Sequence, residues 1–264
     1  MGANERQPQF IEPFNLSAYQ HQAKKSLFAS YRYNNLEFEE WHAHTQAQLT
    51  YSSQGALQIH TSDGIWTLPQ GRALWIPAGR PHRTHAQGQV KTCNFYCSDR
   101  GKVTDFIALD ISTLTHSLLQ RLIEQQGGDE IHYLMEHLLK FELSRAAVAN
   151  VPFLPLPRER RLKQVAQRLL EEEGAEASLE GLGSVVGAST RTLSRLFRHD
   201  TGLTFSQWRH QLLLMKSVSL IEQGHSLEEA ARRLGYFNGS SFNAMFRKTL
   251  GQTVQRYMKV EWFS

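Results

Sequence analysis

Hydrophobic residues recur with a helical period between Leu179 and Gly251, and the same pattern appears there twice. Each copy predicts a short helix, a turn that begins at a glycine (Gly187 or Gly235), and a second helix with apolar residues at i, i+3 and i+4. The copies are 48 residues apart before the turn and 49 after it, so the second turn is one residue longer. A glycine-containing turn between two short helices is typical of the helix-turn-helix. Two copies in one chain predict a protein that contacts two stretches of duplex.

The first half of the chain instead shows the alternation of apolar and polar residues that is typical of strands. Short alternating segments, such as residues 56–60, are separated by turn residues over most of residues 20–106. Because no helical stretch lies between them, they predict a small antiparallel barrel or double-sheet jelly roll. The period becomes helical in residues 107–149, with one apolar stripe on each side of Gly127-Gly128. The stripes are Leu114, Leu118, Leu119 and Leu122, then Ile131, Leu134, Leu138 and Leu139.

A proline-rich segment, residues 150–157, separates the two halves. Its three prolines exclude helix and favour a semi-rigid extended connector. Residues 158–261 then predict an all-helical domain, in which a helix of about residues 205–223 joins the two repeats. At 1.5 Å per residue this helix spans ~28 Å, so it could hold two recognition helices about one duplex turn apart. The predicted fold is α+β and multidomain, an antiparallel β-barrel with helices followed by a double helix-turn-helix.

The formal net charge of +4 is unevenly distributed along the chain. Residues 158–260 carry 16 Lys/Arg against 10 Asp/Glu, whereas residues 1–157 carry 13 against 14. The basic excess thus lies with the repeats, where a polyanionic partner would need it. Two cysteines, Cys93 and Cys97, are too few for a disulfide scaffold, and we expect buried free thiols. No apolar run approaches the ~20 residues of a membrane span and no signal peptide is recognisable, so we expect a cytoplasmic protein.

The first predicted recognition helix, about residues 189–200, has a basic face. Leu193, Leu196 and Phe197 are its apolar positions. Arginines on the opposite stripe can bond guanine O6 and N7 bidentately or hold phosphate. Charge stripes on helices often only face solvent, but the duplicated motif and the local basic excess favour DNA contact. The predicted DNA-binding residues of this helix are Arg191, Ser194, Arg195 and Arg198.

The second predicted recognition helix, about residues 239–249, is less charged. Its equivalent positions are Ser240, Asn243, Ala244 and Arg247. Asn243 could bond adenine N6 and N7, Ala244 offers a methyl contact, and Ser240 and Arg247 are better suited to phosphate. We therefore expect the second helix to read fewer bases than the first.

This half of the chain resembles the AraC/XylS family of bacterial transcription regulators over about 100 residues. The motifs are Leu182-Gly183, Val186-Gly187-Ala188-Ser189, Leu193, Leu196-Phe197 and Thr201-Gly202, then Ala230-Ala231, Leu234-Gly235-Tyr236, Phe242, Phe246-Arg247 and Gly251. The resemblance implies an activator or repressor that contacts RNA polymerase and forms a homodimer through residues 107–149. Gly183 departs from the family, which usually has alanine there. Glycine inside a helix is ~1 kcal/mol less favourable for helix stability than alanine.

Two segments of the first half resemble the cupin motifs. The first is Trp41-His42-Ala43-His44-Thr45-Gln46-Ala47-Gln48, with glutamine where the motif has glutamate, and the second runs from Gly71 through Pro77 and Gly79 to His82. On a strand, His42, His44 and Gln48 share a face, and inside a barrel they would converge with His82. Three uses remain open: an effector pocket, which Gln48 favours; a divalent metal held by His42, His44 and His82; or hydrogen-bonded core histidines.

The combined prediction is a ligand-responsive, sequence-specific regulator that binds double-stranded DNA at a promoter. Its effector, an unidentified small molecule, would bind at His42, His44, Gln48 and His82. The alternative is a metal-dependent cupin enzyme tethered to a DNA-binding domain. Gln48 argues against the enzyme, because catalytic cupins generally use a carboxylate at that position.

Overall fold

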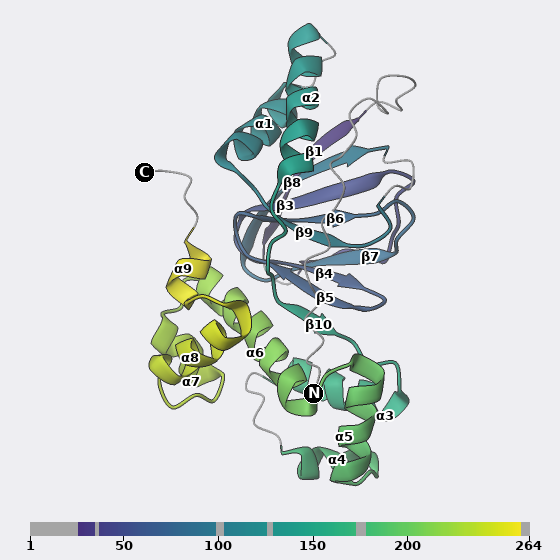
Figure 1. Cartoon of the computed structure of the whole chain (residues 1–264), viewed down its shortest axis with the longest axis vertical. Coiled ribbons are helices and arrows are strands. Elements are labelled where there is room, and N and C mark those ends of the chain that lie inside the picture. Colours follow the sequence, from purple (N-terminus) through teal and green to yellow (C-terminus); the bar gives the residue numbers. More distant parts are fainter. Residues whose placement is uncertain (1–25, 35–36, 99–102, 126–128, 173–177, 260–264) are drawn as a thin grey trace, which may run out of the picture.

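The computed structural model describes residues 26–34, 37–98, 103–125, 129–172 and 178–259. The predicted domain limits at residues 20 and 261, and the glycine pair at 127–128, lie outside these ranges. Figure 1 shows a sandwich of strands beside a group of helices, as the alternating and helical patterns predict. The α+β fold class is therefore confirmed.

The strands form two antiparallel five-stranded sheets that face each other. The first has the order β1 (Leu27–Asn34), β8 (Gln89–Cys97), β3 (Ala47–Gln54), β6 (Arg72–Ile76), β9 (Ile107–Asp110). The second has the order β10 (Phe153–Pro155), β5 (Gly64–Leu68), β4 (Leu57–Thr61), β7 (His82–Ala86), β2 (Glu37–Phe38). Most consecutive strands lie in opposite sheets, as in the predicted jelly roll, whereas β4 and β5 pair with each other in the second sheet.

Strand β3 is buried on both faces, and the two faces differ chemically. Leu49 and Tyr51 belong to an apolar cluster on the outer face of the first sheet. Gln48 and Thr50 point between the sheets, where they bond each other at 2.7 Å and Asn94 of β8 at 3.1 and 2.9 Å. The strand thus places a polar cluster inside the sandwich, while its apolar face packs under helices.

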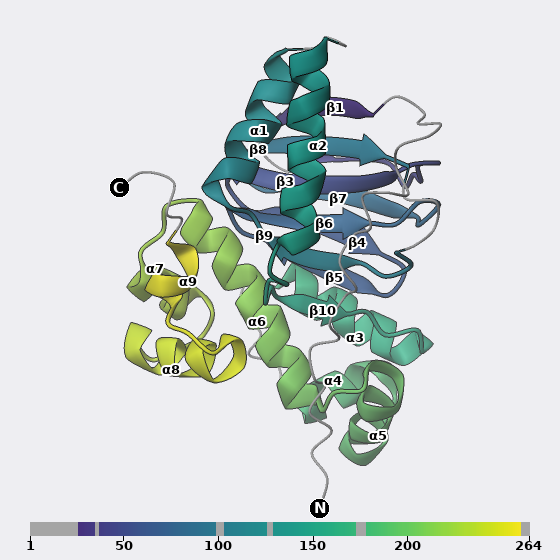
Figure 2. The ribbon, with the colours of Figure 1, turned by 45° about the horizontal axis from the view of Figure 1, so that its top comes forward.

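Helices α1 (Thr113–Glu124) and α2 (Glu130–Arg145) cover that outer face (Figure 2). Three residues of the first predicted stripe are buried against the sheet, but Leu114 is 45% exposed. The second stripe differs more from the expectation, because only Leu139 is buried. Ile131, Leu134 and Leu138 are 62%, 64% and 42% exposed. Most of the apolar face of α2 therefore points away from its own chain.

The predicted connector is extended, and its centre is also a strand. Residues Phe153–Pro155 form β10, which pairs with β5 at the edge of the second sheet. Proline is tolerated there because an edge strand needs hydrogen bonds on one side only. Strand β10 also contacts the helical domain, since the Trp208 indole N–H donates to the carbonyl oxygen of its last residue, Pro155, at 2.7 Å. The two halves are therefore packed directly against each other.

The helical domain follows the predicted order of elements. Its helices are α3 (Arg160–Glu171), α4 (Leu179–Val186), α5 (Thr190–Thr201), α6 (Phe205–Glu222), α7 (Leu227–Arg233), α8 (Gly239–Leu250) and α9 (Val254–Met258). Serines 178, 189 and 226 cap α4, α5 and α7, and Gly187 ends α4 in the left-handed conformation with φ 64°. Gly183 avoids a clash, because a Cβ there would lie 2.3 Å from the Ala188 carbonyl oxygen. Helix α9 was not predicted.

Two smaller expectations can be compared with the structure. Cys93 and Cys97 are buried free thiols, as predicted. Within the described ranges, no helix is long and apolar enough to cross a membrane.

Candidate DNA interface and barrel site

The first recognition helix, α5, presents the predicted basic stripe to solvent. Arg191, Ser194, Arg195 and Arg198 are all exposed, whereas Leu193 and Phe197 on the opposite face are fully buried. Within the described part of the chain, none of these three arginines forms an ion pair. Their guanidinium groups are therefore available to an anionic partner.

The second recognition helix, α8, differs from the prediction at one position. Ser240, Ala244 and Arg247 are exposed as expected. Asn243 is half-buried, and its side-chain oxygen accepts a hydrogen bond from the Val254 N–H at 3.0 Å. This bond ties α8 to the first residue of α9 and gives Asn243 a structural role. In the predicted contact with adenine, this oxygen would have to accept from adenine N6 as well as from the Val254 N–H.

Helix α6 separates the two recognition helices in space. Its 18 residues correspond to ~27 Å, close to the predicted length, and Trp208, Leu212 and Met215 are buried. Figures 1 and 2 both show the α4–α5 pair on one side of α6 and the α7–α8 pair on the other. The two candidate recognition helices therefore lie on different sides of the same long helix.

The barrel histidines converge as the two cupin-like motifs predict. His42, His44 and His82 each offer a ligand nitrogen, and these atoms lie within 4.8 Å of one another. The motifs are joined by two backbone hydrogen bonds between His42 and His82, of 3.0 and 2.9 Å. Gln48 joins the group, since its Oε1 lies 3.2 Å from His82 Nε2. His82 is buried, whereas His42 and His44 are partly exposed, so the cluster is open on one side.

Backbone carbonyls contact the Nδ1 atoms of two of these rings. The His42 Nδ1 lies 2.8 Å from the Glu40 carbonyl oxygen, and the His82 Nδ1 lies 2.9 Å from that of Arg80. A carbonyl oxygen can only accept, so Nδ1 carries the proton in His42 and its Nε2 is left to face the cluster. Metal-binding histidines are oriented in the same way. The neutral His82 ring has an acceptor oxygen at each nitrogen, the Arg80 carbonyl oxygen at Nδ1 and the Gln48 Oε1 at Nε2, and its single proton can bond only one of them. Burial lowers the pKa of His82 to about 4 and also lowers the pKa of His44, which keeps both rings neutral at pH 7.

The donor set fits a divalent transition metal. The buried His44 Nε2 has no hydrogen-bond partner within the described ranges. The Gln48 amide nitrogen donates to Thr50 and Asn94, so its oxygen is the atom that faces His82. Three imidazole nitrogens and one amide oxygen are suitable ligands for Zn²⁺, Ni²⁺ or Cu²⁺, although the amide is weaker than a carboxylate. The same lone pairs would accept hydrogen bonds from an organic effector.

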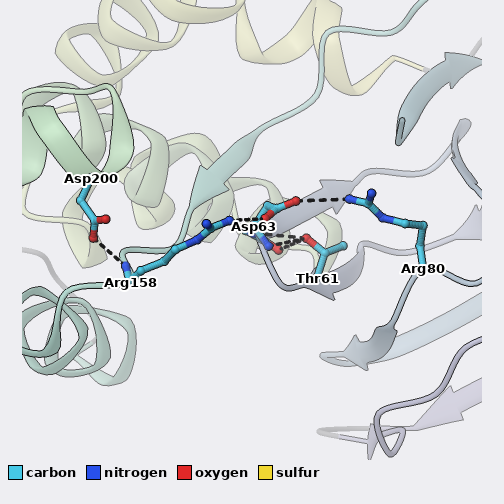
Figure 3. Close-up of polar contacts among 6 residues, drawn as sticks. Thr61, Asp63, Arg80, Arg158 and Asp200 are labelled. Atoms are coloured by element: carbon cyan, nitrogen blue, oxygen red, sulfur yellow. Dashed lines mark hydrogen bonds and ion pairs between the residues drawn. The ribbon is translucent and has the colours of Figure 1, made fainter. Parts of the chain in front are cut away.

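A chain of polar contacts leads from this site to α5 (Figure 3). The Arg80 carbonyl oxygen holds His82, and the Arg80 guanidinium lies 3.3 Å from the Asp63 carboxylate. Asp63 also binds the Arg158 guanidinium at 2.9 Å. The Arg158 N–H in turn donates to the Asp200 carboxylate at 2.6 Å, near the end of α5. The histidine cluster and the first recognition helix are therefore connected through the β4–β5 turn and the segment after β10.

A polar cleft of about 1380 Å³ between the two halves was missed by the sequence analysis. His60 of β4 and His85 of β7 line it from the barrel side, and Ser219 and Glu222 line it from α6. Burial lowers the pKa of both histidines to about 4 and raises the pKa of the Glu222 carboxyl. Strand alternation indicates which residues point outward, but it cannot indicate that another domain lies against that face.

Comparison with known families identifies the family of this chain. The family model described as an AraC-like ligand binding domain matches residues 25–199, and a helix-turn-helix domain model matches residues 182–259. The chain belongs to the AraC family. It is a transcription regulator with a ligand-binding domain and a DNA-binding domain, as its two halves predict.

Named relatives agree with this assignment. The chain is 26% identical over 222 residues to the HTH-type transcriptional regulator NimR of Escherichia coli K12, which covers 82% of this chain and 81% of NimR. It is 34% identical over 213 residues to the regulator RipA of Corynebacterium glutamicum, covering 81% of this chain and 62% of RipA. A structure of ToxT from Vibrio cholerae aligns with 88% of this chain and 96% of its own, at 9% identity and a TM-score of 0.39. The predicted class, a regulator rather than a tethered enzyme, is confirmed by the family and the named relatives.

Proposed function

We propose that this AraC-family regulator recognises its promoter mainly through α5, with α8 contacting a second half-site. The observation that carries the proposal is the exposed stripe of Arg191, Arg195 and Arg198, which has no ion-pair partner in the described part of the chain. Arg191, Ser194 and Arg195 lie toward the N-terminal end of α5, which is the end that reaches base edges in helix-turn-helix proteins. Ser240 and Arg247 would hold phosphate, and Ala244 would contact a base methyl group.

Selection of duplexes from a random pool by the full-length protein tests this proposal. Two conserved blocks whose centres lie about 10–10.5 base pairs apart are expected, because α5 and α8 would enter successive major grooves on one face of the duplex. The block under α5 should be the more strongly conserved. A selected site with a single block would show that only one helix reads sequence.

The active unit would be a homodimer formed through α2. Ile131, Leu134, Leu138 and Phe141 form an exposed apolar stripe at i, i+3, i+7 and i+10. Such a stripe is typical of a helix that pairs with a second helix. Leu134→Glu should give a monomer in sedimentation experiments and weaken binding to a paired site, while Leu114→Glu on α1 is the matched control. As the family resemblance implies, the promoter-bound dimer would then contact RNA polymerase.

The barrel site would sense the effector, with His42, His44, His82 and Gln48 as its ligands. The convergence of three imidazole nitrogens within 4.8 Å favours a bound divalent transition metal, which would act as effector or anchor an organic one. Titration of the metal-stripped protein with Co²⁺ tests this, because coordination by three imidazoles produces visible absorption bands. An unchanged spectrum would favour a metal-free pocket for an organic effector.

A further inference from the structure

The structure identifies the residue that lengthens the second helix-turn-helix. In each turn the residue after the glycine, Ala188 or Tyr236, donates its N–H at 2.9 Å to the carbonyl oxygen five residues earlier. The N-caps Ser189 and Asn238 both accept from the N–H three residues later. Ala188 is followed directly by its N-cap, whereas Phe237 stands between Tyr236 and Asn238. Phe237 is therefore the inserted residue.

The Phe237 side chain is 95% exposed and therefore hardly packs against the rest of the described structure. A hydrophobic residue before an N-cap usually packs against the fourth residue of the helix, which is Phe242 here. Tyr236 takes that place, with its ring edge-on to Phe242 at 5.2 Å between centroids. Single exposed apolar residues are common on protein surfaces. Phe237 differs from these because its ring lies at the end of the second recognition helix.

Phe237 lies at the N-terminal end of α8, the end that enters the major groove in helix-turn-helix proteins. This end is held in place, because the Gly239 N–H donates to the Glu228 carboxylate of α7 at 2.9 Å. The exposed neighbours Ser240 and Ala244 are small and do not cover the ring. The aromatic ring is thus presented on a fixed turn beside the surface that binds DNA.

The chemistry of α8 indicates which base feature the ring would meet. The Asn243 oxygen accepts from the backbone of α9, and the Ser241 hydroxyl donates to the Asn238 carbonyl oxygen. The first two turns of α8 therefore offer base edges mainly the Ser240 hydroxyl and the Asn243 amide N–H. A phenyl ring and the Ala244 methyl instead match the C5-methyl group of thymine, the one apolar feature of the major-groove edge. We propose that Phe237 contacts the C5-methyl group of a thymine in the half-site under α8, so that this helix selects thymine by an apolar contact.

This proposal rests on the proposed role of α8, and replacing thymine by deoxyuridine tests it directly, because only the methyl group is lost. The probe is the duplex that full-length wild-type protein selects from a random pool, with each thymine under α8 replaced in turn. For the wild type, one or two replacements should raise Kd about four-fold, the effect of one buried methyl-sized group. Phe237→Ala should bind the thymine duplex about ten-fold more weakly and show no further loss with deoxyuridine. Phe237→Leu should keep part of the discrimination.

Tyr31→Ala is the matched control, since it removes an exposed aromatic ring from β1 at the far side of the barrel. It should bind both duplexes as the wild type does. Wild-type protein that binds the thymine and deoxyuridine duplexes equally would overturn the proposal while leaving the function of α8 intact. Equal losses of Phe237→Ala on both duplexes would also overturn it. Failure to select any duplex would overturn this proposal and the proposed function together. Unchanged DNA binding of Phe237→Ala with impaired transcription would overturn it in favour of a protein partner.

Discussion

Substituting the arginines of α5 one at a time should separate base contacts from phosphate contacts. Arg195→Ala should weaken binding to the selected site by ~1–3 kcal/mol, which is about 5- to 150-fold in Kd, and the loss should be concentrated at one or two base pairs. Arg198→Ala should weaken binding to every duplex by a similar factor. The reason is position along the helix: Arg195 lies mid-stripe, whereas Arg198 is nearly a turn further along, in the last turn before Gly202.

The structure also gives the expected effect of these substitutions on stability. Arg195 and Arg198 are exposed and form no ion pair within the described ranges, so each change should alter the free energy of unfolding by no more than about 0.5 kcal/mol. Thermal unfolding of both variants should therefore match the wild type. A loss of DNA binding can then be attributed to the contact itself.

Fluorescence anisotropy with a labelled site and single-base variants, measured from low to moderate salt, provides the assay. Removing a phosphate contact should reduce the slope of log K against log salt by about 0.9 per contact. We expect this reduced slope for Arg198→Ala, and for Arg195→Ala a loss that depends on the base pair. Equal losses on all site variants by both proteins would refute the assignment of Arg195 to bases.

Further outcomes follow from the other sites. Base changes in the half-site under α5 should weaken DNA binding more than base changes under α8, because three arginines face the first half-site. A scan of all single-base variants in which both half-sites lose affinity equally would contradict this. His44→Ala and His82→Ala should leave a folded, DNA-binding protein that has lost its response to Co²⁺ or to the effector; unfolding on loss of a stoichiometric metal would instead indicate a structural site. Asp63→Asn should release Arg80 and Arg158 and reduce the difference in DNA affinity between effector-free and effector-bound protein. Because these ion pairs are partly exposed, this difference in affinity should change only a few-fold, which corresponds to ~0–1 kcal/mol. An unchanged difference would show that these ion pairs do not couple the effector site to DNA binding.

The helix-turn-helix pairs could be predicted nearly residue by residue because their signals are local. A serine N-cap, a left-handed glycine and an apolar period each depend on neighbours within one or two turns. Ser178 and Ser189 cap α4 and α5 by such local bonds, and Gly187 begins the turn as predicted. The convergence of His42 and His82 was also predictable, but only because two motifs known to meet in one fold occur together.

The features that were missed depend on contacts between distant segments. Strand β10 exists because residues 153–155 meet β5, about 90 residues earlier, and no local pattern indicates that partner. The bond between Asn243 and the Val254 N–H was missed because the five-residue helix α9 was not predicted. Similarly, the apolar period of α2 predicts a buried face but not whether its own chain or another molecule buries it.

The pairing of β10 with β5 determines how this protein can be divided. A fragment that begins at residue 158 lacks Pro155, so the Trp208 indole loses its acceptor and the apolar residues around it lose Leu154. A fragment that ends at residue 149 leaves β5 as an uncovered sheet edge, which is prone to pair with other chains. Exchange of DNA-binding domains between relatives should therefore be attempted after Pro155, with the strand left on the barrel. The graft would then need a residue that presents a hydrogen-bond donor at the position of Trp208.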